Sequence, residues 1–185
     1  LATFEAVTVH DVKAVEYLIK ESLSQIGADD LSELVHFCCT SEDINNLSYA
    51  VGLKGAIENV WLPRARTLID TLAQMAEDLA DTPMLSHTHG QPATPSTMGK
   101  EFAVFVHRLA RQYRRIENTE YLGKINGATG TYAAHTVAAP GVDWPHVAQT
   151  FVEKLGLTFN PLTTQIESHD FQAELYADLA RFNRI

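Results

Sequence analysis

Apolar residues recur every three or four positions along most of this sequence. The pattern is clearest between residues 98 and 116, where the recurring residues are Met98, Phe102, Phe105, Leu109, Tyr113 and Ile116. Because an α-helix turns once in about 3.6 residues, this spacing places the apolar side chains on one helix face. A chain built from such segments has to bury helix faces against one another. The sequence therefore predicts an all-α protein.

Further helices are expected on the same grounds. One runs from Asp11 through Leu23, and a long one runs from a cap at Thr40 or Ser41 to Leu79. Pro63 should kink the long helix or split it in two, because proline cannot donate a backbone hydrogen bond. A shorter helix is expected around Val147, Phe151 and Leu155, and a last one follows residue 169.

The segments between these helices are rich in glycine, proline and small polar residues. Residues 83–93 are expected to form a loop, after which Thr94 would cap a helix that begins with Pro95. Loops are also expected at "LGKINGATGTY" and at "NPLTTQIESHD", which leads into the last helix. Long amphipathic helices joined by polar loops predict an elongated helical bundle.

The two ends of the sequence lack the usual boundary signals. The chain begins with Leu1, and its final helical pattern stops without a glycine or a proline. We therefore expect a segment of a longer chain.

Charge and cysteine content restrict the classes of function. The net charge is −9, which argues against nucleic acid as the main partner, although a local pocket can still be positive. No apolar run is long enough to cross a bilayer, so no membrane partner is expected. The only cysteines are the neighbours Cys38 and Cys39, whose bridge would be strained. We expect free thiols in a reducing compartment, which fits a cytoplasmic protein.

Four short polar stretches lie at or just before predicted helix starts. They are "TVHD" at residues 8–11, "CTSED" at 39–43, "SHTHGQPATP" at 86–95 and "TTQIE" at 163–167. Backbone N–H groups at a helix start, together with Ser and Thr hydroxyls, bind carboxylate or phosphate. The sequence thus predicts an anionic small-molecule site assembled from distant segments. A histidine in such a site suits proton transfer, and binding alone is the other possibility.

Each stretch also has a simpler structural explanation. Residues 40–41 could simply be a helix cap, and so could residues 10–11. Gln165 could simply be an exposed loop residue. His87 and His89 form an H-x-H pair, the spacing of some zinc ligands. No cysteine or third histidine lies at ligand spacing nearby, so no metal is expected.

Five stretches together resemble the adenylosuccinate lyases of the fumarase/aspartase superfamily, in particular the bacterial type. They are "HDVKAVEYLIKE", "CTSEDINN", "THGQPATPSTMGKE", "GKINGATGTY" and "NPLTTQIESHD". They follow one another in the family's order and cover essentially the whole chain. Their combination separates this sequence from argininosuccinate lyase, fumarase and aspartase.

The resemblance implies an all-α homotetramer whose central helices pack into a large bundle and whose active sites each take loops from three subunits. It implies the release of fumarate from adenylosuccinate, leaving AMP, and from the succinyl-carboxamide ribotide SAICAR, leaving AICAR. No metal or organic cofactor is used. Residues 1–30 would be the end of the N-terminal helical domain, and residues 31–185 the first, truncated part of the central bundle.

The resemblance also implies roles for individual residues. His89 stands at the position of the general acid, and His10 at a position that places the substrate and supports this acid. The substrate-binding positions are occupied by His10, Asp11, Thr40, Ser41 and Gln165. His87 does not stand at a catalytic position and is expected to be a neighbour only.

Two departures from the family pattern matter. Val9 occupies a position that is usually asparagine, so a side-chain contact there is lost unless the backbone makes it. The mobile loop Ser-Ser-x-Met-Pro-x-Lys-x-Asn-Pro, whose serine is the implied general base, is not found in the 185 residues. The chain is therefore predicted to be inactive alone. The competing hypotheses are another lyase of the superfamily, such as argininosuccinate lyase, and a non-catalytic helical scaffold.

Overall fold

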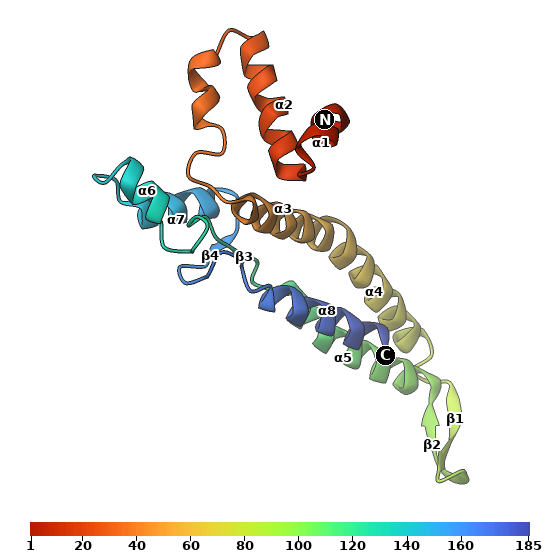
Figure 1. Cartoon of the computed structure of the whole chain (residues 1–185). Helices are drawn as coiled ribbons and strands as arrows, with labels where there is room; N and C mark the ends of the chain where they lie inside the picture. The colour runs from red at the N-terminus through yellow and green to blue at the C-terminus, as the bar shows by residue number, and fades with distance from the viewer. The chain divides into compact units, whose positions relative to one another are not determined.

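The computed structural model describes residues 1–185, and most of them lie in helices (Figure 1). The helices are α1 (Ala2–Thr8), α2 (Asp11–Gln25), the 3₁₀ helix η1 (Asp29–Leu34), α3 (Ser41–Ala56), the π-helical turn η2 (Ile57–Trp61), α4 (Leu62–Asp78), α5 (Met98–Glu117), α6 (Ala133–Ala138), α7 (Trp144–Lys154) and α8 (Asp170–Asn183). The strands are β1 (Pro83–Thr88), β2 (Gln91–Thr97), β3 (Leu122–Gly123) and β4 (Thr158–Phe159). The predicted all-α class is confirmed, because the strands form only two small pairs.

Packing divides the chain into two compact units. The first contains Leu1–Gly52 and Tyr121–Ser168, and the second contains Leu53–Glu120 and His169–Ile185. Each unit therefore combines two segments that are distant in the sequence. The domain boundary expected after residue 30 lies inside the first unit and stays a prediction.

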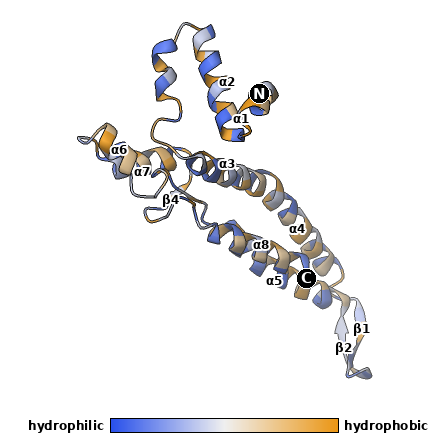
Figure 2. Cartoon of the chain, in the orientation of Figure 1, coloured by the Kyte–Doolittle hydropathy of each residue, from blue (hydrophilic) through white to orange (hydrophobic).

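The second unit is built on α4, α5 and α8. Its buried apolar side chains are Ile57, Ala65, Ile69, Leu109, Tyr113, Ile116, Phe171, Leu175 and Phe182. Gly99 lies so close to α4 that a Cβ atom built on it would be 2.2 Å from the Ala76 carbonyl oxygen. Both hydrophilic and hydrophobic residues occur along each long helix (Figure 2), as expected for helices with one buried face.

Pro63 interrupts the long helix, as predicted. The π-helical turn η2 lies directly before it, and the Leu62 N–H donates to the Ile57 carbonyl five residues earlier. Because Pro63 has no N–H to continue the α-helical ladder, the chain widens by one residue there before α4 begins.

The prediction of a loop at residues 83–93 is wrong. The stretch forms an antiparallel hairpin in which Thr88 pairs with Gln91 and Pro83 with Thr97, with a register shift between Leu85 and His87. Three prolines and the lack of valine and isoleucine hide the strand signal. The prolines are tolerated because both strands are edges.

The start of α5 also differs from its prediction. Thr97, not Thr94, is the N-cap, and its hydroxyl accepts from the Lys100 N–H at 3.2 Å. Pro95 does not begin the helix because it is paired with Leu85 across the hairpin.

The first unit places a short parallel pair, β3 and β4, beside α7 and the first half of α3. Leu122 pairs with Thr158 and Gly123 with Phe159. A Cβ on Gly123 would lie 2.7 Å from Leu47, so this strand approaches α3 as closely as a residue without a side chain allows. No helix in the structure is long and apolar enough to cross a bilayer.

Candidate active site

His10 and Asp11 form the start of α2. His10 is the N-cap, and its Nδ1 accepts from the Lys13 N–H at 3.3 Å. The hydrogen-bond network therefore assigns the proton of a neutral His10 to Nε2, which lies 3.3 Å from the Ser41 hydroxyl. Asp11 Oδ1 lies 3.4 Å from His10 Nδ1 and accepts from the Val12 N–H. Both side chains are exposed, so they are open to a ligand.

Thr40 and Ser41 form the start of α3, where helix N–H groups are available to an anion. Two hydrogen bonds with Asp43 fix the backbone at Thr40. The Thr40 N–H donates to Asp43 Oδ2 at 2.9 Å, and the Asp43 N–H donates to the Thr40 carbonyl at 3.0 Å. This reciprocal pair resembles a capping box, with Asp43 in the third helical position. The Thr40 and Ser41 side chains stay half-exposed.

Gln165 comes from a third segment of the first unit. Its Nε2 lies 3.5 Å from the Thr40 hydroxyl oxygen, which it approaches as a long hydrogen bond. The structure thus brings together five of the six residues singled out in the sequence, from segments 10–11, 40–41 and 165. The shared surface offers hydroxyl, amide and imidazole donors to a carboxylate.

His89 lies in the second unit, at the turn of the β1–β2 hairpin. His89 and Gly90 connect the paired residues Thr88 and Gln91, and their φ angles are 50° and 75°. Positive φ at both central positions is the pattern of a type I′ turn, which suits the twist of a two-residue hairpin. A positive φ is uncommon for a residue other than glycine, although histidine adopts it more often than most residues do. Its side chain is exposed.

His87 lies on β1, paired with Pro92, and is exposed. No group of three or more His, Cys, Asp or Glu side chains in the structure is placed to hold a metal ion.

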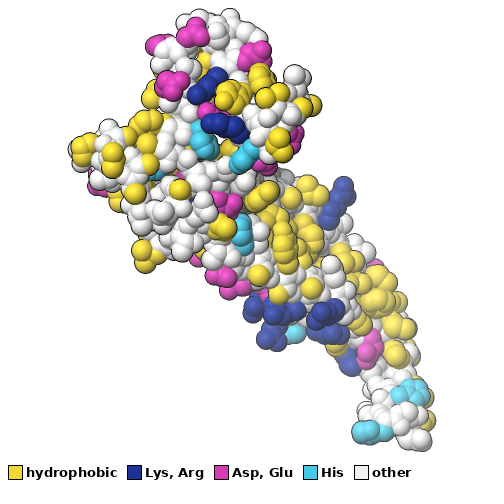
Figure 3. All heavy atoms as spheres, in the orientation of Figure 1, with side chains coloured by type: hydrophobic (Ala, Val, Ile, Leu, Met, Phe, Trp, Pro, Cys, Tyr) yellow, Lys and Arg dark blue, Asp and Glu magenta, His cyan; other side chains and the backbone are white.

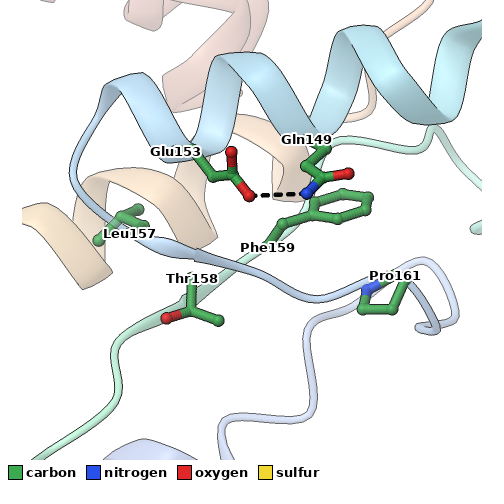
Figure 4. A pocket seen from close by; sticks show the side chains of 6 residues that line it. All are labelled: Gln149, Glu153, Leu157, Thr158, Phe159 and Pro161. Atoms are coloured by element: carbon green, nitrogen blue, oxygen red, sulfur yellow. Dashed lines mark hydrogen bonds between the residues drawn. The ribbon is translucent and has the colours of Figure 1, made fainter.

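Three other surface features do not resemble a catalytic site. A hollow of about 550 Å³ beside α7 and β4 contains one carboxylate, Glu153, which accepts from Gln149 (Figure 4). An apolar hollow of about 480 Å³ lies against α3 and α7 and includes Phe37 and Phe151. Figure 3 shows several basic side chains close together on the face in view. Arginines of α5 and α8 line a hollow of about 330 Å³.

Comparison with known proteins decides the family. A family model described as "Lyase" matches residues 1–185. The chain belongs to this lyase family. The chain is 54% identical over its full length to an adenylosuccinate lyase from Escherichia coli (strain K12), and 53% identical over 98% of its length to one from Vibrio cholerae. It spans 41% and 40% of the length of these two relatives.

The fold of this lyase-family chain also occurs in solved structures. The 3-carboxy-cis,cis-muconate lactonizing enzyme from Pseudomonas putida matches 98% of the chain with a TM-score of 0.78 and 26% identity, and 40% of that enzyme is covered. The fold class predicted from sequence, all-α of the fumarase/aspartase type, agrees with this match.

A buried polar cluster lies beneath the candidate site, and the sequence did not predict it. Asp43 and Lys124 are both fully buried, and Lys124 Nζ lies 2.8 Å from Asp43 Oδ1. The Asp43 carboxylate also accepts from the N–H groups of Thr40, Asn126 and Gly127. The available signal was a lysine inside a glycine-rich stretch, between Gly123 and the apolar Ile125.

The two cysteines of the lyase-family chain are free and half-buried. Burial, with a further contribution from the Asp43 carboxylate, raises the pKa of the Cys39 thiol to about 11. Cys39 is therefore a protonated, weakly reactive thiol at neutral pH.

The burial of His135 predicts that the stability of the chain depends on pH. It is 4% exposed, it packs edge-on against Trp144 at 4.9 Å, and its Nδ1 has no hydrogen-bond partner. Burial lowers its pKa from the ordinary 6.5, although Asp43 opposes the shift. The neutral form is thus favoured by folding, so stability is full above pH about 6.5 and falls as the pH drops toward the folded-state pKa.

His135→Phe should remove this part of the pH dependence. Urea unfolding between pH 7.5 and 5 would show a smaller loss of stability on acidification in the variant than in the wild type. The exposed His146→Gln variant is the control and should keep the wild-type slope. An unchanged slope in His135→Phe would contradict the prediction.

Proposed function

We propose that the protein is an adenylosuccinate lyase, which eliminates fumarate from adenylosuccinate to leave AMP and from SAICAR to leave AICAR. The observation that carries this proposal is the meeting of three distant segments at one surface. His10 lies 3.3 Å from Ser41, and Gln165 lies 3.5 Å from Thr40. The 54% identity to the Escherichia coli adenylosuccinate lyase supports the same assignment.

The residues of this site suit a β-elimination. A base removes a proton from the carbon next to a carboxylate, the carbon–nitrogen bond breaks, and an acid protonates the departing nitrogen. Negative charge develops on the carboxylate, so fixed donors around it lower the barrier. In the proposal Asp11, Thr40, Ser41 and Gln165 bind the substrate, and the start of α3 adds N–H groups.

The two histidines, His89 and His10, are proposed to have different roles. His89 is proposed as the general acid that protonates the nitrogen, a role worth about 10²–10⁴ in rate. His10 is proposed to place the substrate and to support this acid, through the Nε2 atom that also reaches Ser41. The implied general base is the serine of the mobile loop, which is not among these residues.

The wider setting is also part of the proposal. The enzyme would need no metal or organic cofactor, would act in the cytoplasm, and would form a homotetramer in which neighbouring subunits complete each active site. Exposed apolar side chains on long helices, such as Val104 and Phe105 of α5, favour burial against further helices.

Substrate tests on the full-length protein decide the activity. Adenylosuccinate, SAICAR, argininosuccinate and malate would each be offered, and turnover followed by absorbance. Only the first two should be consumed, with fumarate and AMP or AICAR formed. Turnover of argininosuccinate instead would favour another lyase of the superfamily, and no turnover at all would favour a scaffold. The 185-residue chain is the negative control, and fumarate release by it alone would contradict its predicted inactivity.

A further inference from the structure

Asn126 joins three segments beneath the candidate site. It is 1% exposed, and its backbone N–H donates to Asp43 Oδ1 at 3.1 Å. Its side-chain Nδ2 donates to the Thr163 hydroxyl at 2.7 Å, and its carbonyl accepts from the Tyr132 N–H. One buried residue is therefore bonded both to the start of α3 and to the loop that contains Gln165.

The backbone around Asn126 lies directly against the same loop. Gly130 has φ 71°, and a Cβ built on it would lie 2.3 Å from the Thr163 carbonyl oxygen. Only glycine can occupy this position, because any other residue would displace the backbone of the Thr163 loop. Gly127 has φ 83° and donates its N–H to Asp43 Oδ2 at 3.1 Å. The segment 124–130 therefore contacts both loops through backbone as well as side chain.

These contacts connect two predicted substrate contacts to each other. Asp43 holds the Thr40 N–H, and Thr163 lies two residues before Gln165. Asn126 donates a hydrogen bond from its backbone N–H to Asp43 and another from its side chain to Thr163. It therefore sets the spacing between the Thr40 and Gln165 side chains. The long 3.5 Å contact between Gln165 and Thr40 is too weak to set this spacing without help.

We propose that Asn126 is a positioning residue of the active site, which fixes the Thr163–Gln165 loop against the start of α3 through its bond to Thr163. It does not touch the substrate, because it is buried. Lys124 supports this role, since its ammonium group neutralises the Asp43 carboxylate that anchors Asn126. The inference rests on the proposed function for its effect on turnover, but not for its effect on the loops.

The first test uses the 185-residue chain and needs no activity. In Asn126→Ala the backbone amide resonance of Gln165 should shift, because the side-chain bond to Thr163 is lost. The resonance of Thr40 should shift less, because the backbone N–H of residue 126 still donates to Asp43. Asn118→Ala is the matched control, since its side chain donates to the Arg114 carbonyl at the exposed end of α5. An unchanged Gln165 resonance in Asn126→Ala would overturn the inference, whether or not the protein is a lyase.

The second test measures turnover of adenylosuccinate by the full-length protein. Asn126→Ala and Thr163→Val should each lower kcat/KM about 10–100-fold, since a misplacement of about 1 Å has effects of that size. The double variant should be no worse than Thr163→Val alone, because Thr163→Val already removes the bond that Asn126→Ala removes, together with the bond from the Thr163 hydroxyl to the Thr164 carbonyl. Thr163→Ser keeps the hydroxyl and should restore the wild-type value.

The outcomes separate the two proposals. A wild-type protein that turns over no adenylosuccinate contradicts the proposed function, and the amide resonances then decide the role of Asn126. An active wild type whose Asn126→Ala variant loses only thermal stability, with kcat/KM unchanged, contradicts the positioning role. Additive losses in the double variant contradict it as well.

Discussion

Replacing His89 by glutamine in the full-length protein is expected to lower kcat about 10²–10⁴-fold, with little change in KM. Glutamine keeps a polar side chain of similar length but cannot deliver a proton to the departing purine nitrogen near neutral pH. The loss should therefore appear in the chemical step and not in substrate binding. Steady-state kinetics with adenylosuccinate would measure it.

The position of His89 in the hairpin makes a second variant necessary. Its φ of 50° is unfavourable for most residues but is tolerated by asparagine. His89→Asn should therefore preserve the turn and still lose the same activity, which separates a lost acid from a distorted hairpin. His87→Gln, on the same exposed hairpin, is the matched control and should stay near wild type. A His89→Asn variant with unchanged kcat would remove His89 from the acid role.

Asp43→Ala is expected to destabilise the chain by about 3–5 kcal/mol, the usual effect of removing one partner from a buried ion pair. Lys124 would be left fully buried without its counter-ion. The N–H groups of Thr40, Asn126 and Gly127 would also lose their acceptor. Urea unfolding of the chain followed by circular dichroism would measure the effect, which added salt should change little because the pair is buried.

A double variant keeps this prediction testable if Asp43→Ala does not fold. Asp43→Asn combined with Lys124→Met removes both charges at nearly constant volume, and it should be more stable than Asp43→Asn alone. Asp78→Ala, an exposed carboxylate on α4, is the control and should change stability by less than about 0.5 kcal/mol. A double variant no more stable than the single one would show that the pair is not coupled.

The helices were predictable where their apolar spacing is regular. The apolar spacing on α5 predicted a helix at the right place, and Leu109, Tyr113 and Ile116 are buried as expected. Met98 and Phe105 of the same predicted face are exposed. The start of α5 was misplaced by three residues because Thr94-Pro95 and Thr97 carry equally good local signals. The hairpin that pairs Pro95 with Leu85 decides between them, and such pairing is absent from the local sequence.

The exposed residues of the candidate site were predictable from the sequence, but the buried residues that hold them in place were not. Thr40 and Ser41 stand out because small polar residues at helix starts have a recognisable chemistry, and Gln165 stands out through the family resemblance. Lys124 does not stand out, because a lysine in a glycine-rich loop is normally solvated. Only the fold reveals that it is fully buried against Asp43.

Helix content and the chemistry of the exposed site follow from the sequence, because both depend on neighbouring residues and on side-chain type. The tertiary structure alone decides how the loops that contain Thr40 and Gln165 are held. Asn126 and Asp43 are 83 residues apart and Asn126 and Thr163 are 37 apart, so no local pattern links them. Burial removes water as an alternative partner, and this turns an ordinary loop asparagine into the link between Thr40 and Gln165.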